Sequence, residues 1–338
     1  MKFLEILQKA IVCKWSDIHL TTDKNIYYRQ NNKLNIWEDE FFTREDFREV
    51  IENTLNETQK ILFRQNKVID YAYEFNNRRF RINIYMIYKG YGMAIRLIND
   101  NVKPIENFYQ QKVLRDILHN DNGLILICGA TGTGKSTTLA SMIEYINQNK
   151  SKHIITLEEP IEYVFTNKKS LIHQREYHVD FENFSEAIKM AMRQDPDVIM
   201  VGEIRDTETM KACLNAAETG HLVLGTLHAS SVIEAIIRME SFFNQEQIEA
   251  ISMQIASSLN SIIIQKLIST IDENLVCCMD ILLATTAVKN LISKNQLSQL
   301  ISQMQLNRQN GMQFIRDDIE KLVKAKLIDE KIAKKYIG

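Results

Sequence analysis

The sequence lacks the features of secreted, membrane-spanning or strongly nucleic-acid-binding chains. Its five cysteines form an odd set without a C-x-x-C pair, which argues against a disulfide framework or a zinc ribbon. No apolar run approaches the roughly 18 residues of a membrane span, and charges interrupt the apolar start, so no signal peptide is indicated. A net charge of -2 gives no general attraction to nucleic acid. We therefore expect a protein of the reducing cytosol, which could act on a membrane system only from its cytosolic face.

Two α/β domains are predicted on either side of a polar segment that contains Pro104, one of only three prolines. Residues 1–98 form the first predicted domain, residues 99–105 a linker, and residues 106–338 the second domain. In the second domain strands alternate with helices, which is typical of a parallel sheet covered on both faces. A C-terminal helical region is expected over residues 287–338.

The segment from Gly129 to Ser136 reads G-A-T-G-T-G-K-S and fits the phosphate-loop pattern G-x-x-x-x-G-K-[ST]. An apolar strand over 124–127 precedes it, and a helical segment from Lys135 to Asn149 follows, which is the context that the motif requires. A glycine-rich turn that matches by chance is the alternative, and the strand and helix together disfavour it. The sequence predicts a site for a nucleoside triphosphate.

The residues of this loop have separate expected tasks. Its glycines let the backbone wrap a polyphosphate, while consecutive N–H groups and the helix N-terminus supply positive potential. Lys135 is expected to reach the β- and γ-phosphates, and the hydroxyl of Ser136 to ligate Mg²⁺. The predicted nucleotide-binding residues are Gly129, Ala130, Thr131, Gly132, Thr133, Gly134, Lys135, Ser136 and Thr137.

A hairpin and a helix are predicted in the first domain. Strands over 26–29 and 34–37 flank Asn31-Asn32, a pair suited to the positive-φ positions of a tight turn. Thr43 can cap one helix that follows. The apolar residues at helical spacing in this helix are Phe47, Val50, Ile51, Leu55 and Ile61.

Two strands are then predicted over 79–86 and 92–98. In the first, apolar residues alternate with polar ones, so that one face packs and the other presents arginines. Arginines on a solvated sheet face are one interpretation of this pattern. The other makes Arg81 or Arg96 a charge clamp on a nucleotide bound by the second domain.

Carboxylates follow the strand predicted over 153–157, in the segment Glu158-Glu-Pro-Ile-Glu162. The carboxyl end of a strand is where open α/β sheets place ligands. These acids could orient the water that attacks the γ-phosphate, because phosphoryl transfer depends mainly on positioning and charge stabilisation. A solvated acidic turn is the alternative.

A four-residue apolar strand over 198–201 ends in Gly202 and Glu203, which is the form of a Walker B strand. Its carboxylate is expected to hold Mg²⁺ through the water shell of the ion. Glutamate is longer than the usual aspartate, and Gly202 leaves room for such a contact. Asp206 is expected to cap the helix that reaches Glu218.

Histidines lie at both ends of another buried strand, His221 before it and His228 after it. Two histidines could suggest a metal site. However, no cysteine or carboxylate spacing supports zinc here. We therefore expect both to act as hydrogen-bonding sensors of the nucleotide state.

The order of these blocks resembles the secretion ATPases of the type II and type IV pilus superfamily. The four blocks, called Walker A, Asp box, Walker B and His box, are the phosphate loop, Glu158-Glu-Pro-Ile-Glu162, Asp195-Pro-Asp…Gly-Glu-Ile-Arg-Asp206 and Glu218-Thr-Gly-His…Gly-Thr-Leu-His228. The similarity extends to Ser16-Asp-Ile-His-Leu20, Arg79-Phe-Arg-Ile-Asn83, Gln265-Lys-Leu and Gly311-Met-Gln313. It therefore covers nearly the whole chain.

Within this superfamily the sequence is most similar to the pilus retraction ATPases, the PilT family. Assembly and type II secretion ATPases usually carry a longer N-terminal region and a four-cysteine metal-binding insertion, which this sequence does not show. The segment Ala287-Val-Lys-Asn-Leu-Ile292 resembles Ala-Ile-Arg-Asn-Leu-Ile of retraction ATPases, with departures at Val288 and Lys289. The Asp box reads Glu-Glu-Pro where Glu-Asp-Pro is common, so Glu159 also departs from the pattern.

The resemblance implies a PAS-like first domain, a RecA-like second domain and a homohexamer that hydrolyses ATP with Mg²⁺. It makes Glu162 the catalytic base or water-positioning residue, and it makes Glu203 the support for Mg²⁺ together with Ser136. The predicted catalytic set is completed by Lys135, Glu159, His228, Arg81 and Arg96. The expected partners are an inner-membrane platform protein and the pilus machinery, reached from the cytoplasmic face of the inner membrane. Twitching motility, and sometimes DNA uptake, would follow.

Three other functions remain open on the sequence alone. A DNA-translocating RecA-type motor would need basic, aromatic-bearing loops, of which the sequence gives little sign, so no direct nucleic acid partner is expected. A nucleotide-dependent scaffold without turnover is disfavoured by the acids Glu162 and Glu203. An assembly or secretion ATPase of the same superfamily is separable by the effect of a gene deletion on surface pili.

Overall fold

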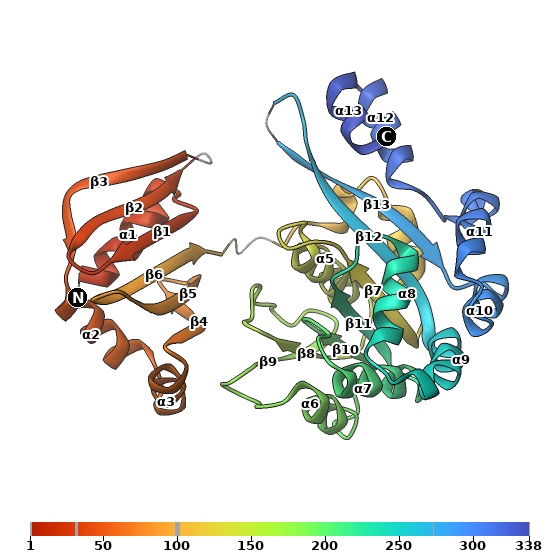
Figure 1. Ribbon diagram of the computed structural model, residues 1–338, viewed down its shortest axis with the longest axis horizontal. Helices are drawn as coiled ribbons and strands as arrows, with labels where there is room; N and C mark the ends of the chain where they lie inside the picture. The colour runs from red at the N-terminus through yellow and green to blue at the C-terminus, as the bar shows by residue number, and fades with distance from the viewer. Residues whose placement is uncertain (1, 31–32, 99–101, 273, 338) are drawn as a thin grey trace. The chain divides into compact units, whose positions relative to one another are not determined.

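The computed structural model describes residues 2–30, 33–98, 102–272 and 274–337. The described residues form two compact units (Figure 1). The first unit is not continuous in sequence. Besides the range Met1–Asn101 it contains two later segments, Glu159–Val164 and Glu176–Asp180, and the remaining residues form the second unit.

The domain limits expected from the sequence stay predictions. The predicted turn Asn31-Asn32 and residues 99–101 of the predicted linker lie outside the described residues. The two later segments of the first unit were not anticipated from the sequence, because their membership depends on contacts between residues far apart in the chain.

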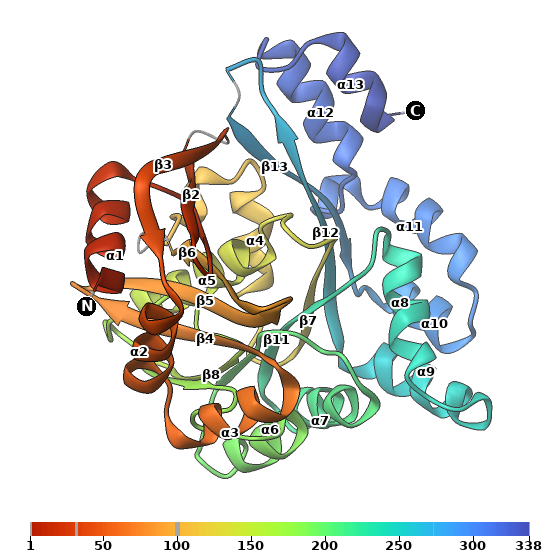
Figure 2. The same ribbon diagram turned by 60° about the vertical axis from the view of Figure 1, so that its left-hand side comes forward.

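The first unit is built on an antiparallel sheet. Within the residues described, it has six strands in the spatial order β3-β2-β1-β6-β5-β4. They are β1 (Asp17–Thr21), β2 (Lys24–Gln30), β3 (Lys33–Phe42), β4 (Val68–Phe75), β5 (Arg78–Ile87) and β6 (Gly90–Leu97). Helices α1 (Lys2–Cys13) and α2 (Arg44–Thr54) bury Phe3, Leu7 and Phe47 in one core with the apolar face of this sheet (Figure 2).

The helix predicted after Thr43 is interrupted. Thr43 caps α2 as expected, but a second helix, α3 (Glu57–Asn66), begins two residues after α2 ends. The side chain of Asn56 accepts a backbone N–H of this second helix and so starts it at a new angle. The single helical period therefore does not continue, and Ile61 is 52% exposed instead of lying on the apolar face.

A mixed sheet forms the centre of the second unit. Over the described part of the chain it has seven strands in the order β13-β12-β7-β11-β10-β8-β9. They are β7 (Gly123–Cys128), β8 (His153–Glu158), β9 (Leu171–Glu176), β10 (Val198–Val201), β11 (Leu222–Leu227), β12 (Leu259–Ser269) and β13 (Leu275–Leu283). Neighbouring strands run parallel to one another in the order β12, β7, β11, β10 and β8. Strand β13 runs antiparallel to β12. The predicted strand–loop–helix context of the phosphate loop is confirmed.

Helices surround this sheet. They are α4 (Gln111–Ile117), α5 (Lys135–Asn149), α6 (Phe184–Ala191), α7 (Thr207–Glu218), α8 (Val232–Ser241), α9 (Ile248–Ser258), α10 (Thr286–Ser293), α11 (Leu300–Leu306), α12 (Ile315–Lys324) and α13 (Glu330–Ile337). Short 3-10 turns cover Ile105–Asn107, Gln245–Gln247, Leu297–Gln299 and Arg308–Asn310. In the described residues, no helix is both long and apolar enough to cross a membrane.

The expected C-terminal helical region follows the β12–β13 hairpin. Helices α12 and α13 lie beside the distal part of this hairpin in both ribbon views (Figures 1 and 2). A small core joins them to it, in which Ile268 and Cys278 of the hairpin contact Ile319 and Leu322 of α12. The hairpin therefore connects the C-terminal helices to the strand that lies next to the phosphate loop.

Candidate nucleotide site

The phosphate loop follows β7, whose six residues are all buried. Gly134 starts α5 with a φ of +84°, a left-handed conformation that favours glycine. Gly129 meets a different constraint, because a Cβ there would lie 2.7 Å from the backbone oxygen of Gln265 in β12. The loop thus lies tightly against the neighbouring strand, a requirement that the sequence pattern did not reveal.

Lys135 is folded back onto the loop. Its Nζ donates to the carbonyl oxygens of Gly129, at 2.8 Å, and Ala130, at 3.0 Å. The positive charge is therefore held directly above the backbone that the motif assigns to phosphate. Ser136, the residue after Lys135, is exposed in the first turn of α5.

Glu203 and His228 meet at the carboxyl ends of two adjacent parallel strands, β10 and β11. His228 Nε2 lies 3.1 Å from Glu203 Oε1, and an Arg205 nitrogen lies 2.9 Å from Glu203 Oε2. Burial raises the pKa of the Glu203 carboxyl, but the hydrogen bond and charge of Arg205, with the charges of His228 and Lys135, outweigh it and leave the pKa below its ordinary value. Glu203 is therefore ionised at neutral pH.

The two histidines of the His box lie at opposite ends of β11. Nδ1 of His221 is 2.9 Å from the carbonyl oxygen of Ala216, in the last turns of α7. The same carbonyl oxygen also accepts the backbone N–H of His221 at 3.1 Å, near the end of the helix that begins at the predicted cap Asp206. Of the two histidines, His228 is next to Glu203 and His221 is at the other end of the strand.

The acids of the Asp box are divided between the two units. Glu158 is the last residue of β8 and is buried, where its carboxylate accepts from the Thr156 hydroxyl at 2.7 Å and from Gln174 at 3.1 Å. Glu159 and Glu162 belong to the segment of the first unit that begins directly after it. The Glu158 carboxylate is therefore already hydrogen-bonded to its neighbours. Glu159 and Glu162 are left as the candidate catalytic acids of this segment.

Sequence reasoning missed two residues that hold this segment. Arg79 donates through Nε to the carbonyl oxygen of Ile161 at 2.7 Å, and it also forms an ion pair with Glu176. The same carboxylate accepts the backbone N–H of Ile161 at 3.2 Å. The alternating arginines of β5 were the available sequence signal for this contact. The partner of Arg79 is Glu176, almost a hundred residues downstream, and only the structure identifies it.

Arg81 and Arg96 lie on the face of the first sheet opposite to its core. Arg81 contacts the carboxylate of Asp70 through two nitrogens and lies 3.7 Å from Glu162. Arg96 is directly opposite Arg81 in the register of β5 and β6, and its Nε donates to Asp17 at 2.8 Å. The structure thus brings Arg81 and Glu162 together within the first unit.

The residues near the loop fit a magnesium ion that is held mainly by a nucleotide. Among the residues described, no group of three or more His, Cys, Asp and Glu side chains could form a metal site by itself. The donors available in the second unit are the exposed hydroxyl of Ser136 and the ionised Glu203, whose two oxygens already contact His228 and Arg205. Oxygen donors of this kind suit Mg²⁺ when phosphates and water complete its coordination.

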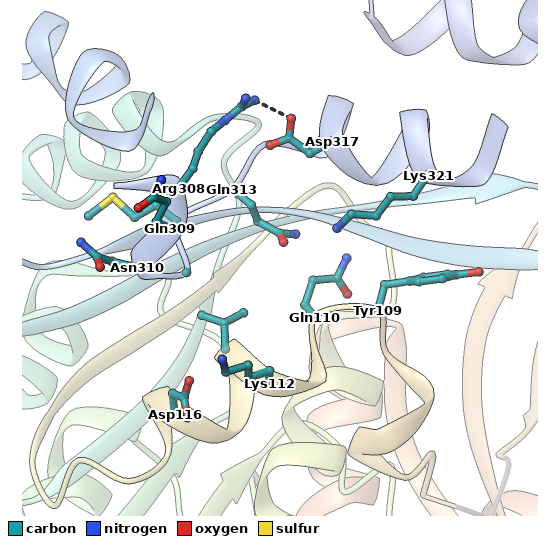
Figure 3. A pocket seen from close by; sticks show the side chains of 13 residues that line it. Tyr109, Gln110, Lys112, Asp116, Arg308, Gln309, Asn310, Gln313, Asp317 and Lys321 are labelled. Carbon is teal, nitrogen blue, oxygen red and sulfur yellow. Dashed lines mark hydrogen bonds and ion pairs between the residues drawn. The ribbon is translucent and has the colours of Figure 1, made fainter. Parts of the chain in front are cut away.

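A separate hollow lies between α4, α12 and the turn at Arg308–Asn310 (Figure 3). Its volume is about 430 Å³, and none of the phosphate-loop residues lines it. Lys112 and Lys321 line it, together with an ion pair between Arg308 and Asp317. Its polar lining is distinct from the site at the carboxyl ends of the strands.

Comparison with known proteins assigns the family. The model of the family described as "Type II/IV secretion system protein" matches residues 2–313. The chain belongs to the type II/IV secretion system protein family. The matched range includes residues of both units.

Two relatives match this chain over most of their length. The "Twitching motility protein" of Neisseria gonorrhoeae is 39% identical over 293 residues, 86% of this chain and 78% of that protein. The "Type IV pilus retractation ATPase PilT" of Pseudomonas aeruginosa is 39% identical over 286 residues, 84% of this chain and 83% of that protein. A solved structure, "Crystal Structure of the Pilus Retraction Motor PilT and Bound ADP", is 39% identical with a TM-score of 0.88, covering 98% of this chain and 95% of that one.

Proposed function

We propose that this chain is a motor ATPase that hydrolyses ATP to power the retraction of type IV pili, and thereby twitching motility. The observation that carries the proposal is the full-length similarity to a retraction ATPase and to an ADP-bound retraction motor, combined with a complete phosphate loop. Both units of the chain are matched, so the likeness is not limited to a shared nucleotide-binding core.

In the second unit, the loop from Gly129 to Thr137 binds the phosphates of ATP. Lys135 exchanges its two carbonyl contacts for the β- and γ-phosphates, because an ammonium gains more from anionic oxygens than from neutral ones. Ser136 and Glu203 would hold Mg²⁺ together with the phosphates. When bound, Mg²⁺ neutralises charge on the phosphate oxygens.

Glu162 orients or deprotonates the attacking water, and Glu159 is the alternative residue for that task. His228 contacts Glu203 and reports the state of the nucleotide through this contact. In the assembled motor, Arg81 and Arg96 add positive charge to the transferred phosphate. The 3.7 Å approach of Arg81 to Glu162 supports a shared task for these two residues.

The working form is a homohexameric ring at the cytoplasmic face of the inner membrane. It passes motion to a platform protein of the pilus machinery, and pilin subunits leave the fibre as a result. Support for this arrangement comes from the similarity to a protein named as a pilus retraction motor.

A deletion strain tests the function. Loss of the gene is expected to leave cells with more surface pili and without twitching, and the wild-type gene should restore both properties. Restoration by a Lys135→Ala allele would contradict a motor that depends on ATP. Loss of surface pili in the deletion strain would instead assign the chain to pilus assembly, the second function that the family allows.

A further inference from the structure

Gln265 lies beside the phosphate loop, although it is more than 125 residues further along the chain. Strand β12 runs parallel to β7, and Ile264 is paired with Cys128, the residue directly before Gly129. The next residue of β12, Gln265, is therefore level with the start of the loop. Its side chain is almost completely buried, with 1% of its surface exposed.

Both polar atoms of the Gln265 amide are used. Nε2 donates to the carbonyl oxygen of Thr133 at 2.6 Å, and Oε1 accepts from the hydroxyl of Thr138 at 2.8 Å. Because a carbonyl oxygen can only accept, these partners fix which end of the amide is which. One side chain thus joins the end of the loop to the first turns of α5.

The contact to Thr133 acts on a peptide that faces the nucleotide. In a planar trans peptide, the carbonyl of Thr133 and the N–H of Gly134 point in opposite directions. Holding the carbonyl against β12 therefore directs the Gly134 N–H away from the sheet. Consecutive N–H groups directed in this way are what a phosphate loop offers to its ligand.

The contact to Thr138 fixes the start of α5. Thr138 is fully buried, and its backbone N–H bonds to the carbonyl oxygen of Gly134 at 3.1 Å. The hydroxyl of Thr138 adds a second link, through Gln265, to the peptide that precedes Gly134. The left-handed Gly134 is therefore held on both sides.

We propose that Gln265 is a positioning residue for nucleotide binding, which acts through the Thr133–Gly134 peptide and the first turn of α5. This role rests on the proposed ATPase function. Without Gln265 the peptide is free to rotate, and part of the binding energy of the triphosphate must then order the loop.

Four variants separate this role from simple packing. Gln265→Met keeps the length of the side chain and removes both hydrogen bonds, whereas Thr138→Val removes only one. Thr138→Ser keeps the hydroxyl and is the conservative control. Ser261→Ala is a packing control on the same strand, because Ser261 is fully buried and its hydroxyl has no hydrogen-bond partner among the described residues.

Nucleotide affinity and turnover are measured on the full-length variants, with ADP and a non-hydrolysable ATP analogue as probes. For Gln265→Met, Kd and KM are expected to rise about tenfold or more, in line with the loss of a buried hydrogen bond, while kcat falls less. Thr138→Val is expected to show a smaller rise, and Thr138→Ser and Ser261→Ala are expected to bind like the wild type. Adding Thr138→Val to Gln265→Met should raise Kd no further, because the two substitutions remove the same link.

A lower melting temperature with unchanged Kd for Gln265→Met would overturn the proposal and leave Gln265 as a stabilising core residue. If Gln265→Met does not fold, Thr138→Val with wild-type affinity overturns it equally. A wild-type chain that binds neither probe would contradict the proposed ATPase function itself. A wild-type chain that binds and hydrolyses ATP, with all variants equal to it, contradicts only the role of Gln265.

Discussion

Arg81 and Asp70 form a forked ion pair across β5 and β4. Arg81 Nε lies 3.2 and 3.0 Å from the two oxygens of Asp70, and its Nη2 lies 2.7 Å from one of them. About a third of each side chain is exposed, so the pair contributes at most about 1 kcal/mol to folding. Its clearer effect is to fix the direction of the guanidinium, whose remaining nitrogen lies 3.7 Å from Glu162.

Substitution of these residues tests whether the direction of the guanidinium matters for catalysis. Arg81→Gln and Arg96→Gln are expected to reduce kcat by about tenfold or more while the oligomer still forms, because they remove charge that stabilises transferred phosphate. Asp70→Asn should reduce kcat less and change the free energy of unfolding by under about 1 kcal/mol. Turnover assays measure kcat, and size-exclusion chromatography shows whether the oligomer forms. Loss of the oligomer with normal activity per subunit would make the arginines structural.

Lys135→Ala is expected to reduce ATP turnover by at least about a hundredfold, because it removes the charge assigned to the β- and γ-phosphates. The fold should remain, because the hydrogen bonds of the amine to the carbonyl oxygens of Gly129 and Ala130 lie within the loop itself. Phosphate release and circular dichroism provide the two readouts. Lys169→Ala, an exposed lysine outside the loop, is the matched control. Wild-type turnover in Lys135→Ala would remove the loop from the mechanism.

Glu162→Gln should retain ATP binding and lose hydrolysis by roughly a hundredfold or more, the range of a positioned general base. Glu159→Gln is the matched control, because it makes the same change three residues earlier in the same segment. Nucleotide affinity is compared with kcat for both. A slower Glu159→Gln would transfer the role to Glu159.

Much of the second unit could be predicted from the sequence because its signals are local. The strand before Gly129 and the helix after Gly134 begin and end where the apolar pattern and the glycines indicate. The same holds for the Asp206 cap of α7.

Features that depend on distant residues could not be predicted. The new helix at Asn56 is a different case, because its signal is local: Asn56 forms a capping box with Gln59, and the apolar spacing after Thr43 did not take it into account. The alternation in β5 likewise did not predict that Met86, at the end of the pattern, is 49% exposed. The partners of Arg79 and Gln265 lie almost a hundred and more than 125 residues away, and no local period encodes such pairings.

The pH dependence of stability should report the charge of Glu203. The pKa of this carboxyl in the folded chain lies below the ordinary value of 4.5, so the ionised form stabilises the fold above that pH. This contribution is lost as the pH falls through the folded pKa. Urea unfolding of the wild type and Glu203→Gln should therefore differ most near neutral pH and converge under acid conditions. A difference that grows on acidification would contradict the assigned direction.

Replacement of Lys289 and Asn290 tests whether helix α10 couples ATP hydrolysis to pilus retraction. Lys289 Nζ donates to the carbonyl oxygen of Ser257 at the end of α9, whereas Asn290 is exposed on α10. The double replacement by Ala should leave ATPase activity and oligomers intact and abolish twitching, and Asn290→Ala alone should leave stability unchanged. Motility on agar and surface pili are scored together. Normal twitching of the double variant would exclude a coupling role for both residues.

The link from Arg79 to Ile161 and Glu176 also determines when the first unit can be completed during synthesis. Its main part ends at Asn101, but its last segment ends at Asp180, so 180 − 101 = 79 further residues must be translated. At about 5–20 residues per second, the ribosome needs roughly 4 to 16 seconds for that stretch. During this time the nascent chain carries β5 without the downstream partners of Arg79. The phosphate loop, at residues 129–136, is thus made before the amino-terminal unit can close, and a fragment that stops at Asn101 would lack both of these partners permanently.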